Sequence, residues 1–162
     1  MLGQILSSGQ SSRLYQKLVK ERELVAQVGA GAQERRGPSL FSVTAIVPPG
    51  KQLADVEKAI YEEIERVKNE PVADWEIEKV RMSIRRSRAQ QLQGTLSRAV
   101  TLGILAVYYG DANLINEIEG KYNRVTKEDI QRVARTYFKD TNRTVITTVP
   151  KARATAPTTG SN

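Results

Sequence analysis

The chain has 162 residues, of which 40% are hydrophobic and 27% charged, and 25 Lys and Arg against 18 Asp and Glu give a net charge of +7. This composition supports one domain with a buried core, and we interpret the positive charge as an ordinary basic surface. Because the chain contains neither histidine nor cysteine, it has no imidazole or thiolate for a zinc site and no histidine base for a serine or cysteine nucleophile, which excludes most hydrolytic mechanisms for the chain acting alone.

The first half of the sequence predicts two short helices, a β-hairpin and a long helix. Small and apolar residues alternate in the first strand, and the long helix has an apolar stripe at steps of three and four residues. We expect Gly29 and Gly31 to permit a bulge or the close approach of a neighbouring backbone. The predicted ranges are 1–6 and 11–22 for the short helices, 24–33 and 40–47 for the strands, and 53–67 for the long helix.

Three further helices are predicted before the last helix of the chain. Asp74 is expected to cap the first of them. The segment 96–109 is apolar around much of its circumference, so we expect the most buried helix there, ended by Gly110. Of the two tyrosines that end it, Tyr108 and Tyr109, one is expected to pack and the other to reach water.

The C-terminal part predicts one more helix and a strand. Thr126 and Asp129 have the spacing of a capping box, which predicts a helix start there. The β-branched run 144–149 predicts a final strand. Together these elements predict one α+β domain over 1–150, with an antiparallel sheet layered with helices, and a disordered tail over 151–162.

Five segments carry a family resemblance. Taken together, they are similar to the C-terminal-type, metal-free domain of the pitrilysin/insulinase-like zinc peptidases, the group that includes mitochondrial processing peptidase. The segments are Leu2–Leu6, Ser11–Leu18, Lys20–Leu24, Val72–Lys79 and Val125–Tyr137.

The resemblance implies a mitochondrial-processing-peptidase-like fold, in which similar domains enclose a peptide chamber and one of them holds zinc on an H-x-x-E-H helix. This chain is then a non-catalytic domain without a cofactor of its own, and zinc is expected in a homologous companion domain. A binding or assembly module of the same fold, without peptidase activity, is the alternative. A basic nucleic-acid-binding domain is a third hypothesis.

The family's substrate-gripping residues are not carried over. Related domains place an arginine and a tyrosine, which would hold peptide carbonyls, where this chain has Val19 and Ala26. Neither side chain can donate a hydrogen bond. Arg22 lies elsewhere on the helix, and Glu23 stands where a glycine is common. We therefore assign no substrate-binding residue and expect a second subunit to supply the Arg/Tyr pair.

Compared with the family pattern, the domain is expected to lack its first strand, because Met1 falls where the first helix is already under way. An exposed strand edge would favour self-association. No membrane span is predicted. A cytoplasmic location, or a periplasmic or secreted one if an upstream signal is missing, remains open.

Two groups of charged residues have a functional and a structural interpretation. Arg81, Arg85 and Arg88 share one helix face beside Arg86 and could contact phosphates, but no aromatic residues interleave them for base stacking. We favour a salt-bridging or solvated face. The carboxylates are likewise expected to be solvated helix surface, namely Glu62, Glu63, Glu65, Glu76 and Glu78.

Overall fold

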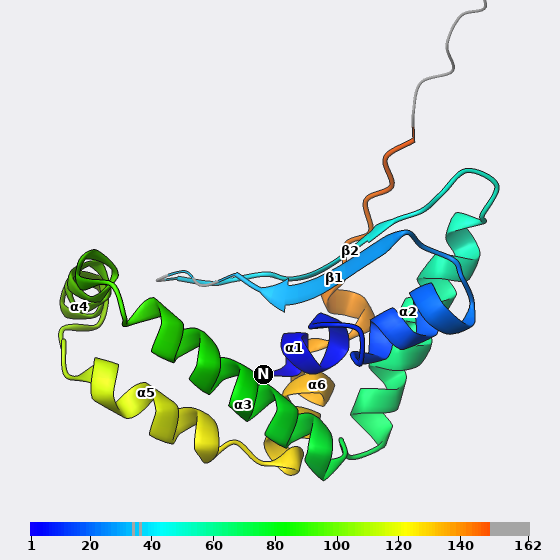
Figure 1. The fold of residues 1–162 in the computed structure, drawn as a ribbon. Coiled ribbons are helices and arrows are strands. Elements are labelled where there is room, and N and C mark those ends of the chain that lie inside the picture. The colour runs from blue at the N-terminus through cyan, green and yellow to red at the C-terminus, as the bar shows by residue number, and fades with distance from the viewer. Residues whose placement is uncertain (34, 36, 150–162) are drawn as a thin grey trace, which may run out of the picture.

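The computed structural model describes residues 1–149 apart from 34 and 36 (Figure 1). Within this range the chain is mostly helical with one two-stranded sheet, so the α+β class is confirmed. The elements are α1 (Leu2–Ser7), the π-helix η1 (Tyr15–Glu21), β1 (Gln27–Ala32), β2 (Phe41–Ile46), α2 (Leu53–Asn69), α3 (Asp74–Gln91), α4 (Thr95–Tyr109), α5 (Leu114–Asn123), α6 (Lys127–Tyr137) and the short 3-10 helix η2 (Asp140–Asn142).

The predicted hairpin is confirmed, and α1 packs directly against it. The strands β1 and β2 pair antiparallel, with Gln27 opposite Ile46 at one end and Ala32 opposite Phe41 at the other. A Cβ atom on Gly3 of α1 would lie 2.8 Å from the Cα of Gly31, so the expected close approach occurs at Gly31.

Ser7 of α1 satisfies both backbone groups of one β1 residue. The Ala30 N–H donates to Ser7 Oγ at 2.7 Å, and the Ser7 hydroxyl donates to the Ala30 carbonyl oxygen at 2.8 Å. These groups therefore face α1, and a strand added to β1 would have to compete with Ser7 for them.

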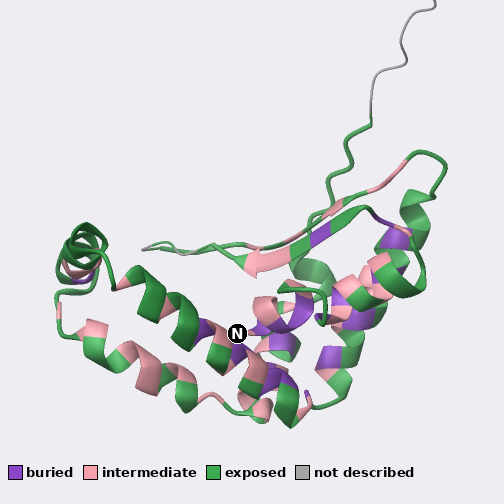
Figure 2. Cartoon of the chain, viewed as in Figure 1, coloured by how far each residue is buried: buried purple, intermediate pink, exposed green. Residues whose placement is uncertain are grey.

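The core lies where α1, η1, α2, α3 and α6 meet beneath the sheet (Figure 2). The helix α2 packs against η1 and α6, and Phe41 of β2 meets Phe138 with ring centroids 4.8 Å apart. The largest completely covered apolar side chains are Ile5, Leu6, Leu14, Leu18, Val67 and Val80.

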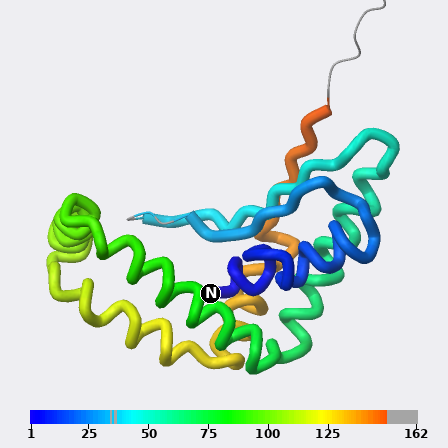
Figure 3. Tube along the Cα trace, in the orientation of Figure 1, coloured from blue at the N-terminus to red at the C-terminus, as the bar shows by residue number. Residues whose placement is uncertain are grey.

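The helix α4 stands away from this core. Figures 1 and 3 show it at the far end of an arm built from α3, α4 and α5, at the opposite end from α2. Only Leu105 of α4 is buried, and Tyr108 and Tyr109 are 54% and 60% exposed. The prediction of a most buried helix is therefore wrong, as is that of one packed tyrosine, because α5 covers only one side of α4.

The predicted final strand is also absent from the described residues. Thr144–Val149 has no strand assignment, and Val145, Ile146 and Val149 are more than half exposed. A β-branched run forms a strand only beside a neighbour, and the described sheet consists of β1 and β2 alone. The expected tail, 151–162, lies outside the described residues.

Helix ends follow local sequence with one exception. Thr126 Oγ1 accepts from the Asp129 N–H and Asp129 accepts from the Thr126 N–H, as predicted, and Gly110 ends α4 with φ +74°. Asp74 does not cap α3, since Ala73 is the N-cap. The carboxylate of Asp74 instead lies 2.6 Å from Lys127 Nζ.

Candidate functional site

The positions expected to carry the gripping Arg and Tyr lie on neighbouring elements. Val19 is half-buried on η1 and packs against the core, and Ala26 is exposed just before β1. The π-helix packs against β1, so the two positions belong to one region of the surface. Their aliphatic side chains offer no donor for a peptide carbonyl.

Arg22 is occupied by a partner of its own. Its Nη2 lies 2.6 Å from Glu62 Oε2 on α2, and both side chains are partly exposed. The ion pair holds η1 to α2. Arg22 is thus committed to a structural contact and does not stand in for the arginine that Val19 replaces.

The π-helix ends in a strained residue. Arg22 N–H donates to the Lys17 carbonyl five residues back, which is the π-type spacing, and Glu23 then takes φ +49°. This left-handed conformation favours glycine, because a Cβ crowds the following carbonyl. The glycine common at this position in related domains therefore has a physical reason, and Glu23 occupies it at a cost.

A buried ion pair joins η1 to α3. Arg13 Nε and Nη2 each donate to Glu76 at 2.7 Å, and the Ala73 N–H donates to Glu76 Oε2 at 2.8 Å. Burial would raise the pKa of Glu76, but these hydrogen bonds and the Arg13 charge outweigh it and hold the pKa below its ordinary value. The expectation that Glu76 is solvated is wrong.

Glu63 of α2 is a second buried carboxylate. Its side chain is 7% exposed, and its nearest ion-pair partner, Arg66 Nη1, is 3.9 Å away. Burial raises the pKa of Glu63, while the charges of Arg66, Arg13 and Lys17 oppose the rise. Expectation and structure differ here too, because the covering residues on η1 are remote in sequence.

The structure was then searched for metal-binding groups. Among the described residues, no group of three or more His, Cys, Asp or Glu side chains could hold a metal ion. The two buried carboxylates are used separately, Glu76 by Arg13 and Glu63 by its position against η1. A zinc-type donor set, which needs imidazole or thiolate, does not fit the residues of this chain.

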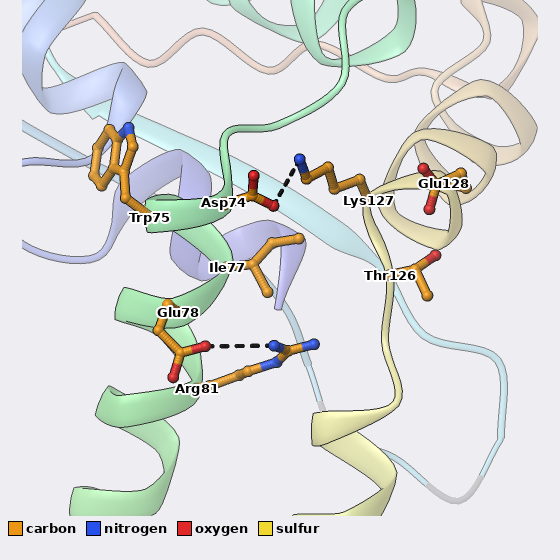
Figure 4. Close-up of a pocket in the computed structure, with 8 residues that line it drawn as sticks. All are labelled: Asp74, Trp75, Ile77, Glu78, Arg81, Thr126, Lys127 and Glu128. Atoms are coloured by element: carbon orange, nitrogen blue, oxygen red, sulfur yellow. Dashed lines mark hydrogen bonds and ion pairs between the residues drawn. The ribbon is translucent and has the colours of Figure 1, made fainter.

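A shallow cavity of about 620 Å³ lies between the first turns of α3 and α6 (Figure 4). Its charged residues pair with one another: Lys127 with Asp74 at 2.6 Å, and Arg81 with Glu78 at 3.4 Å. Trp75 is 57% exposed beside it. With its charges paired and no nucleophile or base held free, the cavity offers surface for contact and no catalytic constellation.

The arginine face of α3 is structural. Arg85 Nε lies 2.8 Å from Glu119 Oε1, and Arg88 Nη2 donates to the Ile115 carbonyl at 2.6 Å. Arg81 Nη2 donates to the carbonyls of Asn123 and Val125. These arginines therefore clamp α5 antiparallel to α3, which supports the salt-bridging interpretation over phosphate binding. No helix in the described range has the length and apolarity needed to cross a membrane.

Fold and site together define a non-catalytic α+β domain with no residues for metal-dependent hydrolysis. Comparison with known families agrees: the model described as the Peptidase M16 inactive domain matches residues 1–84. The chain belongs to this family of zinc-protease inactive domains, as its sequence resemblance indicated.

Individual relatives share the fold at low identity. The zinc protease PqqE of Helicobacter pylori is 24% identical over 147 residues, which cover 90% of this chain and 32% of that protein. The crystal structure of a protease from Helicobacter pylori superposes with a TM-score of 0.78 at 23% identity, over 87% of this chain and 34% of the other.

An inactive peptidase domain from Bordetella parapertussis matches with a TM-score of 0.76 at 25% identity, over 88% of this chain and 76% of that one. The chain thus spans about a third of the length of the two Helicobacter pylori proteins and most of the isolated inactive domain.

Proposed function

We propose that this chain is the non-catalytic domain of a zinc metallopeptidase, which packs against a homologous zinc-bearing domain and helps to enclose the chamber where peptides are cut. The observation that carries the proposal is the match to the inactive-domain family in a chain without a single histidine or cysteine. A domain of this kind contributes walls and contacts, while another domain supplies the metal.

The chain's length relative to its relatives supports a companion. Two proteases that it resembles are about three times as long as the matched part, so the corresponding segment in each is one part of a larger protein. We further propose that a second subunit supplies the arginine and tyrosine for which this chain has Val19 and Ala26, because neither aliphatic side chain can bind a peptide carbonyl.

The test is reconstitution with an H-x-x-E-H polypeptide encoded in the same genome, scored by complex formation and by cleavage of an unfolded fluorogenic peptide. We expect the chain alone to be inactive and the complex to cleave much faster than the companion alone. A companion that is fully active alone and does not bind this chain would contradict the proposal. A stable complex without cleavage would favour the alternative, an assembly module.

A further inference from the structure

One face of α4 carries an apolar stripe that stays open to solvent in the described part of the chain. Leu96 and Val107 are 78% and 72% exposed, and Val100 and Ile104 between them are 51% and 46% exposed. Their spacing of three and four residues places them, with Gly103, on one helix face. These five residues are here called the α4 stripe.

The stripe faces away from the contacts that hold α4 in place. Leu105, the buried residue of α4, lies on the opposite side of the helix, and α4 packs against α5. Figures 1 and 3 show α4 at the end of the arm, where the rest of the fold does not obstruct approach. An apolar patch of this kind on a folded domain marks an interaction surface.

We propose that the α4 stripe is a self-association surface, on which α4 of a second copy packs in the antiparallel direction. The stripe is nearly symmetric about Leu102, so an antiparallel partner places its Val107 against Leu96 and its Ile104 against Val100. Gly103 lies near the centre, with nothing within 4 Å of where its Cβ would be, which lets the two backbones approach closely.

Charge favours a second copy over an ionic partner at this face. Arg98 is the only charged residue of Thr95–Tyr109, and it points away from the stripe, with its Nη2 donating to the Leu92 carbonyl at 2.9 Å. Two antiparallel copies therefore bury no charge on the seam. The four large side chains expose on the order of 500 Å² per copy, so a dimer that covers them with their immediate neighbours reaches the lower bound of stable interfaces.

The other surface proposed for self-association, the β1 edge, is less available. Ser7 already bonds both backbone groups of Ala30. The α4 surface also does not depend on a zinc-bearing companion, so the dimer can fail while the proposed function stands, and the reverse.

Sedimentation velocity over a wide concentration range tests the surface. We expect a monomer–dimer equilibrium that tightens as salt is raised, because screening relieves the repulsion between two chains of charge +7 while apolar burial is retained. Val107→Glu should weaken the dimer by about a hundredfold or more, since it places a charge on the seam. Tyr109→Glu is the matched control, because Tyr109 is 60% exposed on the opposite face of the same helix, and it should leave the dimer unchanged.

Disulfide trapping tests the geometry independently of any loss of folding. The chain has no native cysteine, so Leu96→Cys and Val107→Cys introduce single thiols. A mixture of the two variants should oxidise to the mixed dimer, with little dimer of either variant alone. A wild-type chain that stays monomeric at all concentrations, equal effects of the two glutamate variants, or preferential like-with-like disulfides would overturn the proposal.

Discussion

At the scale of single residues, Glu23 shows how a family preference follows from backbone geometry. With φ +49°, its Cβ is held in the left-handed region that glycine enters freely. We predict that Glu23→Gly raises the free energy of unfolding by about 1 kcal/mol. Glu21→Gly, two residues earlier in η1, removes the same charge but places glycine within the helix and should lower stability by a similar amount. Urea unfolding of the two variants checks the opposite signs.

The Arg13–Glu76 pair is the ionic contact on which stability should depend most. Arg13→Ala leaves Glu76 buried without its partner, so we predict a loss of about 3 kcal/mol. Lys17→Ala breaks the exposed pair with Glu21 and should cost about 0.5 kcal/mol or less. Chemical denaturation at neutral pH measures both, and equal losses would contradict a structural role for the buried pair.

Glu63 should make stability depend on pH in the direction opposite to Glu76. Because its folded-state pKa is raised, the folded chain binds the proton more tightly than the unfolded chain, and stability falls as pH rises from the ordinary glutamate pKa through the raised one. Glu63→Gln should therefore stabilise the chain at neutral pH, with the gain shrinking near pH 4.5. Thermal unfolding at both pH values tests this, and a constant difference would contradict it.

At the scale of elements, the three arginines of α3 determine how firmly α5 is held. Arg81→Met removes the donors to the Asn123 and Val125 carbonyls, and we predict that α5 is locally destabilised by about 2 kcal/mol. Arg86→Met, an exposed position on the same helix, should change little. Hydrogen exchange of 114–123 is the measurement, and equal protection in the two variants would argue against the clamp.

How well an element could be predicted depended on whether its cause is local. The hairpin, the Thr126–Asp129 capping box and the stop at Gly110 follow from neighbouring residues, and the structure confirms them. The burial of α4 and the pairing of Thr144–Val149 depend on partners that sequence periodicity does not specify, and both predictions are wrong for the described chain.

The same distinction explains the site residues. Glu76 looked like one of several surface acids until the fold brought Arg13, 63 residues earlier, against it. The absence of imidazole and thiolate needed no structure, because it is a property of composition. The site was therefore predicted best where it concerned missing chemistry and least where it concerned long-range contacts.

At the scale of the whole molecule, family, fold and composition lead to one account: a peptidase-family domain whose contribution is structural. The Peptidase M16 inactive-domain match and the superposition on an isolated inactive domain place this chain among non-catalytic members. Its conserved-looking features serve packing, such as the Arg13–Glu76 pair and the arginine clamp on α5.

The most direct test measures zinc content and peptide cleavage on the same column fractions of the purified chain. The chain has no histidine or cysteine, so we predict far less than one tightly held zinc per chain and no cleavage above buffer. One zinc per chain, eluting together with proteolysis that a chelator abolishes and zinc restores, would contradict the account.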